Sequence, residues 1–282
     1  MGPPPSGGWG LLGCGLGGFG PNMSGMATVR RVLAPNPGPF TGPGTNTWVL
    51  GDGPALVVID PGPDDDQHLA ALRRTVGGHA VGVVLVTHGH ADHLELAERF
   101  AGQYHARVAR HPDLADGDVV RVGALDLTAL HTPGHAPDHL AFWMPDDRVL
   151  FTGDLILGRG SSMVTYPEGD VAAYLRSLER VAELRPRLLF PGHWDPVEDA
   201  EAKIEEYRQH RLAHERQVVD ELDRGGPGTA TGLTERVYSD ELAATEAREQ
   251  LLRAAEMTLR AHLRKLVDEG RVAERDAVFE LV

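Results

Sequence analysis

The stretch that decides the fold is Val84-Leu85-Val86-Thr87-His88-Gly89-His90-Ala91-Asp92-His93. It begins as an apolar, β-branched run typical of a buried strand and ends in three histidines and a carboxylate. Imidazoles two positions apart on an extended chain point to the same side, so His88 and His90 can hold one ion. A turn into a helix would bring Asp92 and His93 beside them. The sequence therefore predicts one loop that serves two neighbouring metal ions.

Three later segments repeat this design, each with a potential metal ligand after a strand and a glycine-containing turn. They are His131-Thr132-Pro133-Gly134-His135, Phe151-Thr152-Gly153-Asp154 and Phe190-Pro191-Gly192-His193-Trp194. Loops at strand ends are where a rigid sheet presents functional side chains. We therefore add His135, Asp154 and His193 to the candidate metal ligands.

Short β-branched runs alternate with helical patterns from about residue 29 to residue 196, which predicts a mixed α/β layered domain. The expected strands are Trp48–Leu50, Ala55–Ile59, Val81–Val86, Leu125–Leu130, Leu140–Trp143, Arg148–Thr152 and Arg187–Phe190. Helices are expected to begin near Asp64, Asp92 and Asp170, because acidic residues stabilise helix N-termini.

The domain organisation follows from composition along the 282 residues. Residues 1–26 are rich in glycine and proline and lack periodicity, so they are expected to form a disordered leader. A catalytic domain is expected over residues 27–222. The glycine-rich break at Gly225-Gly226-Pro227-Gly228 separates it from a C-terminal domain over residues 223–282.

The C-terminal segment has the outline of a winged helix: a helix with Leu252, Leu259 and Leu263 on one face, then two short apolar pieces. Residues 201–282 carry 13 basic against 18 acidic side chains, which favours a packing or dimer-forming role over nucleic-acid binding. The whole chain has a formal net charge of -14, which weighs against a nucleic-acid coat or a membrane-surface protein. No apolar run is long enough for a membrane span. The single cysteine, Cys14, cannot form an internal disulfide, so we expect a cytoplasmic location.

The ordered set of motifs resembles the metallo-β-lactamase superfamily, whose αββα sandwich carries H-x-H-x-D-H followed by His, Asp and His. The resemblance covers about residues 29–200. It implies that one metal is bound by His88, His90 and His135, that the second is bound by Asp92, His93 and His193, and that Asp154 bridges them. The segment Val58-Ile59-Asp60-Pro61-Gly62 is similar to an early motif of the superfamily, which makes Asp60 a candidate for orienting a ligand.

More specifically, the chain resembles the subgroup called β-lactamase-like protein 2, and this resemblance extends to the C-terminus. The matching segments are Gly44-Thr45-Asn46-Thr47, Thr132-Pro133-Gly134-His135 with Asp138-His139, Gly153-Asp154-Leu155-Ile156-Leu157-Gly158, Pro191-Gly192-His193 and His262-Leu263-Arg264-Lys265-Leu266. Members of this group and its neighbours are hydrolases that include single-strand-RNA nucleases and acyl-thioesterases.

Five histidines and two carboxylates suit two zinc ions, with iron or manganese as alternatives. A metal-bound hydroxide is the expected nucleophile, because metal binding lowers the pKa of water. Asp92 and Asp154 are the candidate catalytic carboxylates. Asn46, His139 and Ser161 are candidates for contacting substrate or for orienting the ligands.

The expected reaction is hydrolysis of a small anionic ester or thioester, or of a phosphodiester, and the acidic composition favours acyl substrates over RNA. The segment from Thr87 to His93 is also similar to the persulfide dioxygenase motif of the same superfamily, in which a single iron performs oxidation. A further alternative is a winged-helix DNA-binding regulator. The substrate and the oligomeric state are left open.

Overall fold

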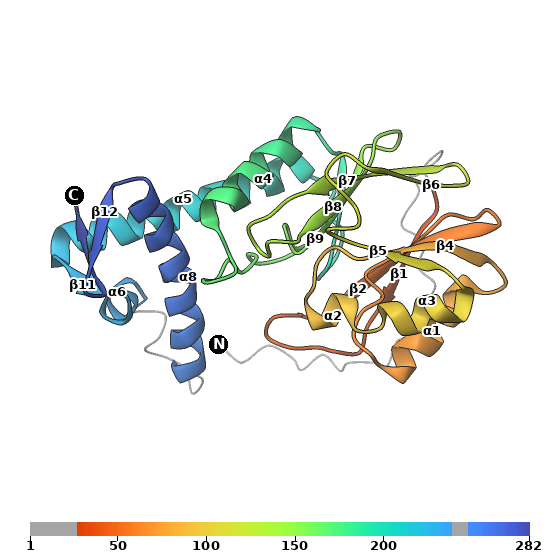
Figure 1. Ribbon diagram of the computed structural model, residues 1–282, viewed down its shortest axis with the longest axis horizontal. Helices are drawn as coiled ribbons and strands as arrows, with labels where there is room; N and C mark the ends of the chain where they lie inside the picture. The colour runs from red at the N-terminus through yellow and green to blue at the C-terminus, as the bar shows by residue number, and fades with distance from the viewer. Residues whose placement is uncertain (1–26, 239–247) are drawn as a thin grey trace, which may run out of the picture.

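The computed structural model describes residues 27–238 and 248–282. The predicted leader, residues 1–26, lies outside the described residues. Two five-stranded sheets face each other, and helices cover the outer face of each sheet (Figure 1). The predicted α/β sandwich is therefore confirmed.

The first sheet has the order β1-β2-β3-β4-β5, with bounds Val29–Leu33, Asn46–Leu50, Ala55–Ile59, Ala80–Leu85 and Arg107–Ala109. The second has the order β10-β9-β8-β7-β6, with bounds Leu188–Pro191, Val149–Gly153, Leu140–Met144, Leu125–His131 and Val119–Val122. Strands β3, β4 and β5 are parallel, and so are β9 and β10. Parallel strands are buried on both faces, which is why β3, β4 and β10 read as continuous apolar runs.

Each sheet buries its outer face under two helices. Helices α1 (Asp66–Val76) and α3 (Ala97–Tyr104) cover the first sheet, and α4 (Val171–Glu183) and α5 (Ala200–Gly225) cover the second. Between the sheets the core is aromatic, with the rings of Trp48 and Phe190 at a centroid distance of 4.7 Å. Apolar burial on both faces of each sheet holds the strand ends in fixed positions.

All seven expected strands are present, with boundaries that differ by at most two residues. The strands that the sequence did not predict, β1, β5 and β6, lie at the outer edges of the two sheets. Their residues are partly exposed, so their apolar pattern is weak. The helices expected near Asp64 and Asp170 begin at Asp66 and Val171, where Asp65 and Asp170 accept hydrogen bonds from backbone N–H groups of the first turn. The helix expected near Asp92 is the short α2 (Ala91–Leu94).

The C-terminal part is a winged helix built from α6 (Ala230–Val237), α8 (Arg248–Asp268) and a small sheet of order β11-β13-β12. The strands are β11 (Gly228–Thr229), β12 (Val272–Arg275) and β13 (Val278–Leu281). Its core also includes Val218 and Leu222 of α5, so this long helix packs on both parts of the molecule. The boundary at residues 222 and 223 stays a prediction, and α5 runs across it.

Among the helices of the described residues, none is both long and apolar enough to cross a membrane. The cytoplasmic location stays a prediction.

Candidate metal centre and substrate pocket

Three of the predicted ligands meet at the end of β4. The Nε2 atoms of His88 and His135 lie 2.9 Å and 3.1 Å from Nδ1 of His90. One ligand atom from each of these histidines lies within 4.8 Å of the other two. The structure thus brings together residues that are up to 47 positions apart in the chain, in the set expected for the first metal.

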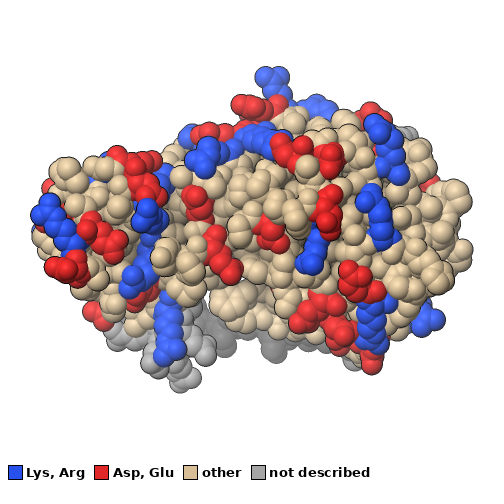
Figure 2. Space-filling model, in the orientation of Figure 1, with Lys and Arg blue, Asp and Glu red and all other residues tan. Residues whose placement is uncertain are grey.

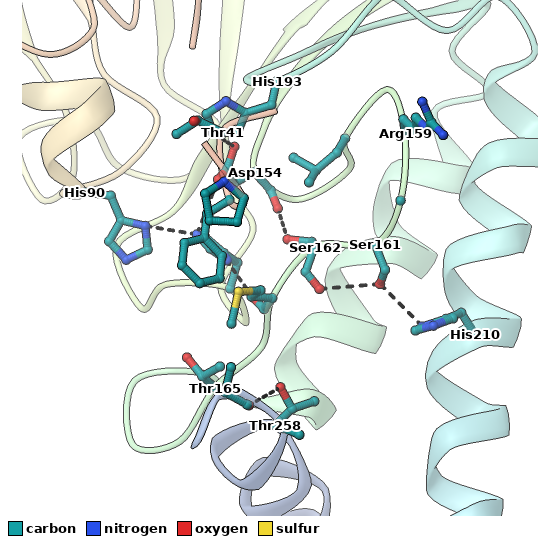
Figure 3. Close-up of a pocket in the computed structure, with 18 of the residues that line it drawn as sticks. Thr41, His90, Asp154, Arg159, Ser161, Ser162, Thr165, His193, His210 and Thr258 are labelled. Carbon is teal, nitrogen blue, oxygen red and sulfur yellow. Dashed lines mark hydrogen bonds and ion pairs between the residues drawn. The ribbon is translucent and has the colours of Figure 1, made fainter. Parts of the chain in front are cut away.

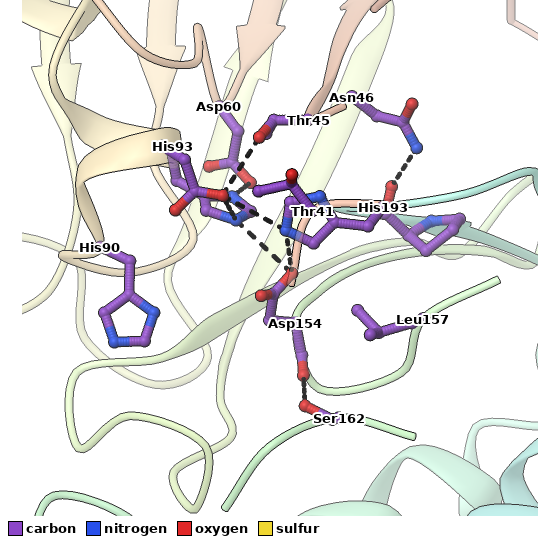
Figure 4. Close-up of polar contacts among 12 residues, drawn as sticks. Thr41, Thr45, Asn46, Asp60, His90, His93, Asp154, Leu157, Ser162 and His193 are labelled. Atoms are coloured by element: carbon purple, nitrogen blue, oxygen red, sulfur yellow. Dashed lines mark hydrogen bonds and ion pairs between the residues drawn. The ribbon is translucent and has the colours of Figure 1, made fainter. Parts of the chain in front are cut away.

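The second expected set lies directly beside the first. One ligand atom each from Asp92, His93 and His193 forms a group of the same size. Asp154 lies between the two sets: its Oδ1 is 3.4 Å from Nε2 of His193 and its Oδ2 is 3.7 Å from Nε2 of His135. Asp154 therefore faces both sets, one carboxylate oxygen to each, as a bridging ligand would. Figure 4 shows its contacts with the second set.

The donor atoms of this centre suit a cation. Nε2 of His93 and Oδ1 of Asp154 are buried without a hydrogen-bond partner among the described residues, and they face each other across 3.5 Å. Buried polar atoms normally have a hydrogen-bond partner, so we expect a ligand between these two atoms. Gly192 keeps the space open, because a Cβ there would lie 2.6 Å from Oδ1 of Asp154.

The ring orientations also suit a cation. In four of the five histidines Nδ1 lies against an outer acceptor, which leaves the Nε2 lone pair for the centre. The pairs are His88 with Thr87 Oγ1, His93 with Asp60, His135 with the carbonyl of Met163, and His193 with the carbonyl of Gly44.

Charge and burial move the pKa values of the centre in opposite directions. Burial lowers the pKa of His88 well below its usual value. Burial opposes protonation of His193 as well, but Asp154 and Asp92 outweigh it and raise the pKa of His193 to about 9. Burial alone would raise the pKa of Asp92, but hydrogen bonding to His193 and the nearby His93 lower it to about 2. The raised pKa of His193 and the lowered pKa of Asp92 both show that positive charge is stabilised beside the two aspartates.

Asp60 connects the early strand motif to the centre. Its Oδ1 accepts a hydrogen bond from the backbone N–H of Thr87 at 2.7 Å, and its Oδ2 accepts from Thr87 Oγ1 at 2.8 Å. Nδ1 of His93 also lies 2.8 Å from Oδ2. Asp60 is 1% exposed, so it does not reach the pocket and instead fixes the loop that carries the histidines.

His139 and Asn46 form hydrogen bonds with the backbone of the loops that carry metal ligands. Nε2 of His139 accepts the backbone N–H of Asp154 at 3.2 Å, and its Nδ1 lies 2.8 Å from Thr132 Oγ1. The Nδ2 atom of Asn46 donates to the carbonyl groups of Pro191 and Trp194, which flank His193. Both side chains are fully buried, so they position ligand-bearing loops and do not contact substrate.

The centre opens into a cavity of about 1120 Å³. Its wall includes the apolar side chains of Phe40, Leu157, Met163 and Trp194, and it extends to Ala254 and Thr258 of α8. Figure 3 shows His90, Asp154 and His193 on one side of this pocket, with Ser161 and His210 on the other. The candidate Ser161 therefore lies on the pocket wall, away from the metal ligands.

The structure adds residues that sequence reasoning missed. Thr45 Oγ1 donates to Oδ2 of Asp92 at 3.1 Å, and Ser162 Oγ donates to the carbonyl of Asp154. Arg211 of α5 lines the pocket although it is 2% exposed. Thr45 and Ser162 lie next to the candidates Asn46 and Ser161, whereas Arg211 lies in a charged helix and no motif marks it.

Comparisons with known proteins define the class. The chain matches the metallo-beta-lactamase superfamily over residues 40–116 and 111–193. Residues 229–279 match the beta-lactamase associated winged helix domain. The chain therefore belongs to the metallo-β-lactamase superfamily, whose members are metal-dependent.

Individual relatives place the chain within that superfamily. It is 30% identical over 262 residues to a beta-lactamase-like protein 2 homolog of Caenorhabditis elegans, covering 86% of this chain and 85% of that protein. It is 33% identical to an atrochrysone carboxyl ACP thioesterase of Aspergillus chevalieri, covering 87% of this chain and 82% of the relative. The fold matches a metallo-beta-lactamase family protein of Thermus thermophilus with a TM-score of 0.75 at 25% identity, covering 90% of this chain and 98% of the other. These findings confirm the predicted β-lactamase-like protein 2 subgroup and identify the chain as a hydrolase.

Proposed function

We propose that this protein is a dinuclear zinc hydrolase that cleaves a small anionic ester or thioester. The observation that carries the proposal is the position of the ligand cluster at one end of a large, mainly apolar cavity. An acyl chain can lie along apolar walls while its carbonyl group reaches the ligand cluster. The thioesterase name of one relative supports acyl transfer to water.

The two predicted metal sites use the ligand sets described above. His88, His90 and His135 would hold one zinc ion, Asp92, His93 and His193 would hold the second, and Asp154 would bridge. When bound, zinc supplies a Lewis acid at this position and lowers the pKa of a water molecule. Nitrogen-rich ligand sets of this kind favour zinc, while iron and manganese are the alternatives.

The chain's own residues would perform three tasks around the reacting group. Thr45, His139 and Asp60 hold the ligand carboxylates and imidazoles in place through the hydrogen bonds given above. The apolar side chains of the wall exclude bulk water from the carbonyl group. Asp92 is the more exposed of the two carboxylates, with 27% of its side chain exposed against 12% for Asp154, so Asp92 is our candidate for accepting a proton from the attacking water.

Surface charge supports an acyl substrate over RNA. On the face that Figure 2 shows, Lys and Arg side chains are interleaved with Asp and Glu and form no continuous basic track. A single-strand nuclease normally follows the phosphate backbone with such a track. The formal charge of -14 would further weaken binding to RNA.

A substrate screen on zinc-loaded protein tests the proposal. Acyl thioesters, lactones and single-stranded RNA are compared side by side by initial rate, with and without a chelator. We expect chelator-sensitive hydrolysis of thioesters or esters and little RNA cleavage. Chelator-sensitive RNA cleavage without any acyl hydrolysis would contradict the proposed substrate class.

A further inference from the structure

Arg211 is a buried cation at the pocket wall. Arg211 is 2% exposed, and its guanidinium group lies 5.2 Å from the ring centroid of Tyr174. Within the described parts of the chain, no carboxylate oxygen lies within 4.0 Å of it, and its Nε has no hydrogen-bond partner. Burying an unpaired positive charge is unfavourable, so a counter-charge is expected at this position.

Among the described residues, the carboxylates that line the pocket do not supply that counter-charge. Asp92 and Asp154 face the histidines of the metal centre, at 3.3 Å and 3.4 Å from Nε2 of His193. Glu168 is exposed at the pocket and makes no ion pair with Arg211. The positive charge of Arg211 is therefore available to a molecule that enters the cavity.

The contacts that Arg211 does make leave part of its fork free. One terminal nitrogen donates to Ser161 Oγ at 3.0 Å and to the carbonyl of Ser162. Both acceptors are neutral, and a neutral donor such as an amide would satisfy them equally well. The other terminal nitrogen has no hydrogen bond within the described residues. The two N–H groups of that nitrogen can donate to an oxygen of a carboxylate or phosphate, and such charge-assisted hydrogen bonds are stronger than neutral ones.

Two further polar side chains, Ser161 and His210, lie beside Arg211 at the pocket wall. Ser161 Oγ lies 3.3 Å from Nδ1 of His210, and both residues line the pocket beside Arg211 (Figure 3). Ser162 connects this group to the metal centre, because its Oγ donates to the carbonyl of Asp154. Ser161 lies in the loop after β9, whereas His210 and Arg211 belong to α5. These three side chains form a polar position in an otherwise mainly apolar wall.

We infer that Arg211, Ser161 and His210 form a subsite for an anionic group of the substrate, a carboxylate or a phosphate, on the side of the cavity opposite the metal ligands. The inference rests on the proposed function in one respect, since the anion belongs to the ester or thioester whose carbonyl reaches the metal ligands. A carboxylate would come from the acyl part of the substrate. A phosphate would come from the alcohol or thiol part.

Binding measurements on the zinc-loaded protein test the subsite without requiring turnover. Isothermal titration compares two ligand pairs that differ only in the anionic group: glutarate with pentanoate, and 4′-phosphopantetheine with pantetheine. We expect the more highly charged member of one pair to bind at least about tenfold more tightly, which corresponds to about 1.4 kcal/mol. The pair that shows the preference identifies the source of the anion.

Variants test whether the preference for the more highly charged ligand depends on the subsite. Arg211→Met should abolish the preference and leave binding of the less charged member unchanged. Arg216→Met, which removes an exposed arginine of the same helix, should retain the preference. If Arg211→Met fails to fold, Ser161→Ala takes its place and should lower the preference at least threefold.

The inference is overturned by equal binding within both pairs in the wild-type protein, or by a preference that the folded subsite variant leaves unchanged. The proposed function fails separately, if the protein hydrolyses no ester or thioester while the Arg211-dependent preference is present. Failure of the subsite inference and failure of the proposed function therefore give different experimental results.

Discussion

Nδ1 of His93 lies 2.8 Å from Oδ2 of Asp60, and both side chains are buried away from the pocket. This contact fixes the imidazole so that Nε2 points to the metal centre. The same carboxylate also accepts two hydrogen bonds from Thr87, the residue that precedes the first histidine of the loop. The early strand motif thus orients a ligand that lies 33 positions later in the chain.

We predict that Asp60→Asn lowers metal affinity and kcat/KM together. An amide cannot accept all three of the hydrogen bonds that the carboxylate accepts, and loss of such an outer partner typically costs about 10–100-fold. Competition with a fluorescent chelator measures the affinity. Asp66→Asn, an exposed change at the start of α1, serves as the control and should alter neither quantity.

His90→Ala should remove one metal ion and nearly abolish hydrolysis. Its Nδ1 lies within 3.1 Å of the ligand atoms of both His88 and His135, so its loss leaves two of the three ligands in this set. The loss of activity should exceed the roughly 100-fold that follows removal of an outer partner. Metal content and initial rate are measured on the same preparation, with His79→Ala as the control. Full activity in His90→Ala would reject the mechanism.

Elemental analysis of purified protein should find two zinc ions per chain, because the structure provides two adjacent ligand sets around Asp154. Dialysis against a chelator should abolish activity, and added zinc should restore it. One iron per chain together with oxygen consumption would instead favour the persulfide dioxygenase alternative. This measurement separates hydrolysis from oxidation without knowledge of the natural substrate.

Glu215 should make stability depend on pH in the acid range. Burial would raise its pKa, but Lys265 at 2.6 Å and Arg271 at 2.5 Å outweigh burial and lower it below the usual 4.5. A depressed folded-state pKa contributes stability that is present above the unfolded value and is lost as the pH falls through the folded value.

The corresponding variant is Glu215→Gln. At pH 7 we expect a loss of about 1–3 kcal/mol in the free energy of unfolding, and the difference from wild type should shrink below pH 4.5. Chemical denaturation at both pH values measures it. Glu205→Gln alters an exposed ion pair with Arg208 on the same helix and should change little. An equal difference at both pH values would contradict the assignment.

The winged helix should limit the length of the substrate. Ala254 of α8 lines the cavity, so Ala254→Phe would fill part of its far end. We expect about a tenfold loss of kcat/KM for long acyl thioesters and little change for acetyl thioesters, which stay near the metal ligands. A uniform loss across chain lengths would indicate a general disturbance of the fold.

Several parts of the site follow from local sequence. The β-branched run before Thr87 predicts a buried strand, and histidines two apart on extended chain must share a side, so the first ligand pair is readable without a structure. Later strand-end motifs supplied His135, Asp154 and His193 as further candidates, and the resemblance to one superfamily assigned the ligands to two metals. Sequence position could not reveal the roles of Asn46 and His139, because each acts through a contact with another ligand-bearing loop that folding brings beside it.

The sequence by itself determined the α/β sandwich, the winged helix and the candidate ligands, because hydrophobic periodicity and strand-end motifs are local properties. Only the tertiary structure decided which oxygen of Asp154 faces which ligand set, and that α8 closes the far end of the pocket. It alone showed that Arg211 is a buried cation without a carboxylate among the described residues. Burial and pairing of a charge depend on what packs around it, and in this protein those neighbours come from segments far apart in the chain.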